Sequence, residues 1–168
     1  AKVAGKNGMA ILQDMLYFTA NQEKEHAIVF YNYLKDVFKD ANVSMEANYP
    51  VDLDQDLSSL LEQAAQHEYD EATSIYKQFG DEAKEESYVE IATTFYMICE
   101  IEHYHHERFK KYHNLLTSGK LFNDQSTVKW MCMNCGFIYE GTDALTICPV
   151  CKHPQGYSLR LDESQFHL

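Results

Sequence analysis

Six side chains that can bind metal ions occur as three closely spaced pairs in separate parts of the sequence. The pairs are Glu23 and His26, Glu68 and Glu71, and Glu102 and His105. Each pair is separated by three residues, which places both side chains on the same face of an α-helix. Carboxylates and imidazoles arranged in this way on facing helices are the ligands of two-metal sites in helical bundles. The three pairs therefore predict such a site.

The elements that must position these ligands are predicted from the residues around them. Each pair lies in the middle of an apolar and aromatic stripe with helical spacing; the stripe around Glu102 and His105 runs from Tyr88 to Leu116. Such a stripe faces the interior of a bundle. For one stripe alone, it would be equally plausible that the Glu and His lie on the solvent-exposed face of the helix. Agreement among three stripes favours buried ligands, whose charge a metal ion would compensate.

Three long helices follow from these stripes. They are predicted over residues 9–39, from an N-cap at Asp52 or Asp54 onward, and up to a stop at Ser118 and Gly119. Gly80 favours an end of the second helix, whereas the following Ala83 and Lys84 favour its continuation, and the sequence leaves both readings open.

An internal repeat relates the first predicted helix to the third. The ligand pair and the flanking core residues of segment 12–37 match those of segment 91–116 in type and spacing, at an offset of 79 residues. The later copy follows a helix that carries two carboxylates, but the earlier copy has no such partner. We therefore expect a fourth helix, absent from this chain, to complete the bundle with at least one more Glu ligand. Another polypeptide, a fragment or a symmetry-related chain would supply it.

Four of the five cysteines form a second candidate metal site. Cys132, Cys135, Cys148 and Cys151 follow the pattern CxxC-x12-CxxC. Two CxxC turns bring four thiolates to the corners of a tetrahedron, which suits iron or zinc. A structural zinc ribbon is one reading, and an iron centre that passes electrons to the bundle is the other. The remaining Cys99 is predicted to be a buried, inert thiol.

Composition limits the class of protein. The chain has 168 residues and a formal net charge of −12, which argues against binding to nucleic acid or to an anionic membrane. It contains no apolar run of membrane-spanning length and no signal peptide, so we expect a soluble, cytoplasmic protein. The histidines outside the stripes are expected to be structural or solvated, with His106 as a candidate to orient a ligand.

Several of these motifs together resemble the rubrerythrin family. The runs C-M-N-C-G-F-I-Y-E-G and C-P-V-C-K-H-P-Q resemble its rubredoxin-like tail, and N-Q-E-K-E-H-A, H-E-Y-D-E-A and E-H-Y-H-H-E-R-F resemble its di-iron helices. The resemblance covers essentially the whole chain. It implies an all-α, ferritin-like di-iron domain over residues 1–118 without the family's first helix, a linker over residues 119–129, and a rubredoxin-like domain over residues 130–168.

The resemblance also implies roles for individual residues. Glu23 and Glu102 would bridge two irons, and Glu68 and His105 would bind one of them. The other iron would be bound by Glu71 when oxidised and by His26 when reduced. Tyr76 would form a hydrogen bond near the site, and the four cysteines would hold a third iron. The implied activity is reduction of hydrogen peroxide to water, which protects against oxidative stress. Electrons would come from rubredoxin or an NAD(P)H-dependent reductase, and the protein would form a homodimer or larger oligomer.

Two other functions fit the same residues. A ferroxidase or iron-storage protein would use the bundle with O2 and would accumulate a ferric mineral, without need of the cysteine-rich tail. A non-enzymatic module would use a zinc ribbon to bind a partner and would hold structural metals in its bundle.

Overall fold

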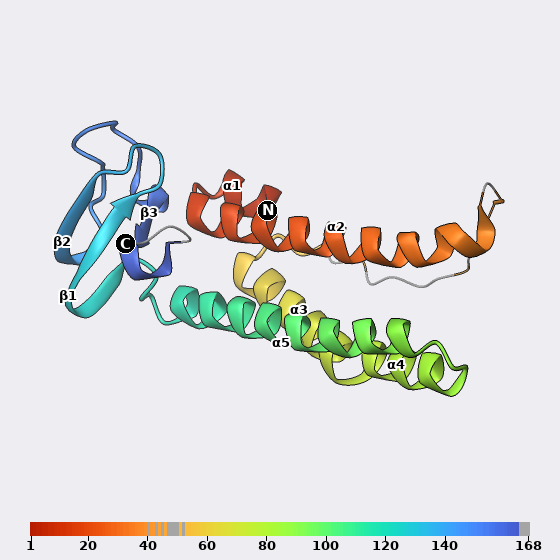
Figure 1. Ribbon diagram of the computed structural model, residues 1–168. Coiled ribbons are helices and arrows are strands. Elements are labelled where there is room, and N and C mark those ends of the chain that lie inside the picture. The colour runs from red at the N-terminus through yellow and green to blue at the C-terminus, as the bar shows by residue number, and fades with distance from the viewer. Residues whose placement is uncertain (40, 43, 45, 47–50, 52, 165–168) are drawn as a thin grey trace. The chain divides into compact units, whose positions relative to one another are not determined.

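A computed structural model describes residues 1–39, 41–42, 44, 46, 51 and 53–164 of the protein (Figure 1). The chain divides into two compact units. One is the helical segment Phe18–Lys111, and the other combines Ala1–Tyr17 with the residues from Tyr112 onward. Within the described residues, no helix has the length and apolarity that crossing a membrane requires.

Two helices of equal length carry the Glu-x-x-His pairs. Helix α2 (Ala10–Phe38) and helix α5 (Val89–Thr117) each contain 29 residues. Their bounds lie within one or two residues of the predicted ones. Gly119 adopts a left-handed conformation with φ of +69°, which only a residue without a Cβ tolerates easily and which ends a helix. The predicted stop of the third long helix is therefore confirmed.

The helix between them is continuous but not uniform. It comprises α3 (Leu57–Asp70), a π-helical turn η1 (Glu71–Ile75) and α4 (Tyr76–Glu85). Its N-cap is Asp56, whose side chain accepts a hydrogen bond from the Ser59 backbone N–H at 3.3 Å. The prediction of Asp54 as the cap was wrong, because its carboxylate instead accepts from the Asp56 N–H at 2.9 Å. The alternative cap, Asp52, lies outside the described residues.

Gly80 lies within α4, so the second helix continues past it. A Cβ built on Gly80 would lie 2.5 Å from Cε1 of Tyr96 on α5, much closer than van der Waals contact allows. The absence of a Cβ at Gly80 thus leaves room for a neighbouring ring, and Gly80 does not end the helix. This resolves the alternative that the sequence left open.

The helical unit has an apolar core around the polar ligands. One part is an aromatic cluster whose ring centroids lie 5.0–6.3 Å apart, formed by Phe30, Tyr76, Phe79 and Phe95. Another contains fully or almost fully buried aliphatic and aromatic side chains, among them Leu61, Ala92, Ile98 and Phe109. A hydrogen bond of 2.6 Å between the Tyr33 and Thr94 hydroxyls links α2 to α5. The ligands therefore sit in a packed interior.

The second unit contains a small antiparallel sheet. Its strands are β1 (Asn123–Cys132), β2 (Ile138–Asp143) and β3 (Ser158–Arg160), in the order β2-β1-β3. The fully buried Trp130 is its central core residue, and its indole N–H donates to the Gly141 carbonyl at 3.0 Å. Strand β1 begins inside the segment predicted as a polar linker. That prediction missed it because polar side chains on a half-exposed strand resemble a loop in sequence.

Short helices complete this unit. They are α1 (Lys2–Lys6) and two 3-10 turns, η2 (Gln155–Tyr157) and η3 (Leu161–Glu163). A Cβ on Gly156 would lie 1.8 Å from the carbonyl oxygen of Gly8, so Gly156 permits two backbone segments far apart in sequence to touch. The predicted division into domains 1–118 and 130–168 stays a prediction.

Candidate metal centres

Three helices bring four ligand side chains to one point in the helical unit. Glu23 comes from α2, Glu68 from α3, and Glu102 and His105 from α5, and one ligand atom of each lies within 4.8 Å of all the others. Glu102 and His105 are fully buried, and Glu68 is only 8% exposed. Charged groups buried in a bundle interior are stable only when they are paired or bind a metal ion, so this cluster is a candidate metal site.

Two imidazoles share the same two carboxylates. The Nδ1 atom of His105 lies 2.7 Å from Glu23 Oε1 and 2.7 Å from Glu102 Oε2. The Nδ1 atom of His26 lies 3.2 Å from Glu23 Oε2 and 3.0 Å from Glu102 Oε1. Each carboxylate thus presents one oxygen to each imidazole, which is the arrangement a carboxylate needs to bridge two cations. Glu68 belongs to the His105 side, at 3.5 Å from its Nδ1.

Buried polar atoms at this point lack hydrogen bonds. Among the described residues, these atoms include Glu23 Oε1, Glu68 Oε2, both carboxylate oxygens of Glu102 and Nδ1 of His105. Their contacts are short but are not directed as hydrogen bonds are. A buried polar atom without a partner costs about 1–3 kcal/mol, and more if charged. Oxygen and imidazole donors that converge in this way fit divalent metal ions, iron included.

Without metal, protons on the two imidazoles balance the carboxylates. Contacts with Glu102 and Glu23 raise the pKa of His26 to about 9. Burial opposes the charge on His105, yet its three carboxylate neighbours raise the pKa of this imidazole to about 11. Burial also acts against the charge of Glu23, but its contacts with both imidazoles lower the pKa of this carboxyl to about 2. Metal binding at Nδ1 would displace these protons.

Glu71 lies beside the cluster in an irregular part of its helix. It is the first residue of the π-helical turn η1, and such turns occur often at functional sites. Burial and then the charges of Glu68, Glu102 and Glu23 raise the pKa of its carboxyl to about 7. The Glu71 carboxylate is therefore within electrostatic range of three of the converging ligands, Glu23, Glu68 and Glu102. Its role as an alternative ligand stays a prediction.

Tyr76 follows this turn and lies in the aromatic cluster. Its ring centroid is 5.8 Å from that of Phe30 and 6.0 Å from that of Phe95. Burial, and then the charge of Glu71, raise the pKa of its phenol. Tyr76 is thus close enough to the carboxylates for their charge to raise the pKa of its phenol. Its hydrogen bond near the site stays a prediction.

The side chains on the Nε2 side of His105 were not predicted from the sequence. His106 was predicted instead as the candidate to orient a ligand. The structure places the Gln22 amide oxygen against Nε2 of His105, and Arg108 donates a hydrogen bond to that same oxygen. The available signal was Gln22 directly before Glu23 and Arg108 one turn after His105. His106 does not contact a ligand through Nδ1, which instead bonds the Ala65 carbonyl of α3 at 2.7 Å.

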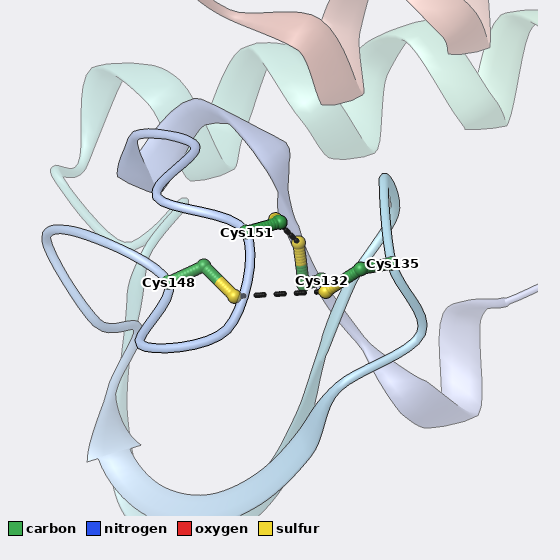
Figure 2. Close-up of side chains that lie close together, drawn as sticks. All are labelled: Cys132, Cys135, Cys148 and Cys151. Carbon is green, nitrogen blue, oxygen red and sulfur yellow. Dashed lines mark hydrogen bonds between the residues drawn. The ribbon is translucent and has the colours of Figure 1, made fainter.

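The four cysteines converge in the second unit. Cys132 ends strand β1, the other three lie in the turns that follow or on a second loop, and all four sulfur atoms face one another (Figure 2). The Sγ atoms of Cys132 and Cys151 are 3.6 Å apart, and those of Cys135 and Cys148 are 3.7 Å apart. All four are free of disulfides. A tetrahedral metal with bonds of about 2.3 Å to sulfur would separate its ligands by about 3.8 Å, so this geometry fits a tetrathiolate site.

The two CxxC turns are built alike. The Gly136 N–H donates to the Cys132 carbonyl at 2.8 Å, and the Lys152 N–H donates to the Cys148 carbonyl at 3.0 Å. Gly136 and Lys152 both have positive φ, +74° and 64°. The His153 backbone N–H lowers the pKa of Cys151 to about 5, which favours the thiolate that a metal requires.

Comparisons with known proteins cover both parts of the chain that hold these sites. A family model described as "Rubrerythrin" matches residues 1–113, and one described as "Rubrerythrin, rubredoxin-like domain" matches residues 130–157. Rubrerythrin of Clostridium perfringens is 41% identical over 157 residues, 94% of this chain and 80% of that protein. Rubrerythrin of Nitratidesulfovibrio vulgaris is 34% identical over 154 residues, 92% of this chain and 78% of that protein.

A solved structure supports the fold. Nigerythrin in its fully reduced, all-ferrous state superposes with a TM-score of 0.60 at 21% identity, covering 95% of this chain and 74% of that one. The fold class predicted from the sequence, a helical ferritin-like bundle followed by a small four-cysteine domain, is confirmed. From its matched domains and its relatives, the chain belongs to the rubrerythrin family.

Proposed function

We propose that the protein is a non-haem di-iron peroxidase that reduces hydrogen peroxide to water. The observation that carries the proposal is the pair of carboxylates, Glu23 and Glu102, each of which offers one oxygen to His26 and one to His105. This is a two-metal ligand set, and the same chain holds a four-cysteine site. Membership of the rubrerythrin family supports an oxidoreductase with both sites.

The residues proposed to hold each metal are those that the resemblance implied, and the contacts among the ligands other than Glu71 support them. Glu23 and Glu102 would be shared, Glu68 and His105 would complete one iron site, His26 and Glu71 would serve the other, and the four cysteines would hold a single iron. When bound, the ferrous pair supplies the two electrons that convert H2O2 and two protons to two waters, and the tetrathiolate iron replaces them one at a time.

The chain's own part in the reaction is to position and enclose. Leu61, Ile98 and the aromatic cluster pack around the ligand helices and limit the access of water. Glu102 is fully buried between the two imidazoles and, together with Glu23, would hold both metals. A carboxylate suits the higher metal charge and a neutral imidazole suits the lower one. Glu71 and His26 are therefore proposed to exchange as ligands when the charge changes.

The proposed partners are those expected from the sequence. Hydrogen peroxide would be the oxidant, and rubredoxin or an NAD(P)H-dependent reductase the electron donor, in a cytoplasmic homodimer or larger oligomer. A further helix with a Glu ligand would come from another polypeptide, a fragment or a symmetry-related chain. Exposed apolar side chains on α2 and α5, such as Ile28, Met97 and Ile101, support the need for such a cover.

Metal analysis combined with peroxide turnover tests the proposal. The protein purified without oxygen should contain iron in both sites and consume peroxide stoichiometrically with an added reductant. Growth of a ferric mineral with O2 uptake would replace the proposal by ferroxidase or storage activity. Stoichiometric zinc in the cysteine site, without turnover, would replace it by a binding module.

A further inference from the structure

We infer that Gln22 and Arg108 are positioning residues that fix the orientation and the tautomer of His105, so that its Nδ1 faces the carboxylates. The inference concerns the metal site and does not require peroxidase activity. The peroxidase proposal can therefore fail while the inference about His105 holds. Peroxide turnover tests the first, and metal-binding measurements test the second.

The Gln22 side chain on α2 contacts two residues of α5, His105 and Arg108. Oε1 of Gln22 on α2 lies 3.1 Å from Nε2 of His105 on α5. The same oxygen lies 3.0 Å from Nη1 of Arg108, one turn after His105 on α5. His105 is fully buried, so the group that faces its Nε2 strongly influences how the ring is held.

The chemistry of the three groups fixes the direction of both hydrogen bonds. A guanidinium can only donate hydrogen bonds, so the Gln22 atom that meets Arg108 must be the amide oxygen. An amide oxygen can only accept, so Nε2 of His105 must carry a hydrogen and donate it. The tautomer that remains for a neutral His105 has its lone pair on Nδ1. That atom lies 2.7 Å from oxygens of both Glu23 and Glu102, where a metal would bind.

Arg108 has anchors of its own, which allow it to hold the Gln22 amide. Its Nη1 donates to the Thr19 hydroxyl at 2.8 Å, and Thr19 is only 2% exposed. Its guanidinium carbon lies 4.9 Å from the centroid of the Phe18 ring, in cation–π contact. The Arg108 side chain is thus fixed from two sides, and a loosely held arginine could not orient the amide.

The test is the Gln22→Met variant, which keeps the length of the side chain and removes the acceptor. We expect its bundle site to bind Co²⁺ about 10–100-fold more weakly, the range found when a partner of a metal-bound histidine is lost. Absorption bands of Co²⁺ with nitrogen and oxygen ligands differ from those with thiolates, so the two sites are read separately. Gln22→Glu keeps an acceptor for both His105 and Arg108 and should retain most of the affinity.

A second readout distinguishes positioning from general stability. In the zinc-loaded, ¹⁵N-histidine-labelled protein, long-range ¹⁵N–¹H spectra report which ring nitrogen of His105 binds metal. The wild type should show Nδ1 bound, and Gln22→Met should show a mixture of Nδ1 and Nε2. Gln78→Met is the matched control, since the Gln78 amide donates to the Glu82 carboxylate on the exposed surface of α4; it should leave both readouts unchanged.

Arg108→Gln keeps the test decisive if Gln22→Met does not fold. It removes the donor that orients the Gln22 amide but leaves the His105 bond, so a loss of up to about tenfold in Co²⁺ affinity is expected. Wild-type Co²⁺ affinity together with Nδ1-only coordination in either folded variant would overturn the inference. An equal loss in the Gln78→Met control would overturn it as well.

Discussion

The imidazole rings of His26 and His105 stack with their centroids 5.9 Å apart, although they come from different helices. Glu102 joins them, with one oxygen 3.0 Å from Nδ1 of His26 and the other 2.7 Å from Nδ1 of His105. Glu23 makes the same two contacts from α2. These carboxylate–imidazole contacts affect the protonation of both histidines when no metal is bound.

The metal-free protein should lose stability as the pH rises above neutrality. The pKa of His26 is raised to about 9 and that of His105 to about 11, above the unfolded value of 6.5. The stabilisation from their protonation is complete below about pH 6.5 and is lost as the pH rises through 9 toward 11. Thermal unfolding of chelator-treated protein, followed by helical circular dichroism, should show a falling Tm over this range. A Tm that stays constant from pH 7 to 10 would contradict these pKa shifts.

Substitution of Glu71 and of His26 should affect different oxidation states. Glu71→Ala removes the carboxylate at the start of η1 and should retain metal but bind the oxidised pair poorly. His26→Ala should weaken the reduced pair, because it removes an imidazole in contact with both shared carboxylates. Iron content measured after anaerobic reduction and after oxidation distinguishes the two variants. Glu62→Ala, on exposed α3 surface, is the control. Identical losses in both oxidation states for the two variants would rule out ligand exchange.

Cys148→Ser should eliminate the ferric-thiolate absorption band and stop reduction of the bundle metals by an external donor. The reason is that Cys148 lies 3.7 Å from Cys135 within the tetrathiolate cluster. Cys99→Ser is the matched control, because Cys99 lies on α5, outside that cluster. A visible spectrum unchanged by Cys148→Ser would refute the assignment of iron to this site.

Gly80→Ala should destabilise the protein by about 1–3 kcal/mol through overpacking, despite the roughly 1 kcal/mol by which alanine favours a helix. The new Cβ would meet the Tyr96 ring at 2.5 Å. Chemical denaturation measures the change in the free energy of unfolding. Adding Tyr96→Leu should recover part of the loss, and a more stable Gly80→Ala protein would show that the ring moves away freely.

Local spacing carried most of what the sequence could predict. Residues three or four apart define the ligand pairs and helices α2 and α5, and two short CxxC motifs define the cysteine cluster. These features can therefore be predicted directly from the sequence. Asp56 as the cap, the reason for Gly80 and the π-helical turn at Glu71 depend on neighbours from other segments or on small differences in backbone geometry. The same is true of Gln22 and Arg108, whose contacts join positions 86 residues apart in sequence.

Stopped-flow oxidation of the fully reduced protein tests the peroxidase assignment most directly. The reduced protein is mixed with hydrogen peroxide or with O2 at equal concentration, and the return of the ferric absorption is followed. We expect oxidation by peroxide to be much faster than oxidation by O2, with one peroxide consumed for every two electrons delivered. If O2 reacted as fast as peroxide and ferric mineral accumulated with each turnover, the peroxidase assignment would be wrong and iron storage would take its place.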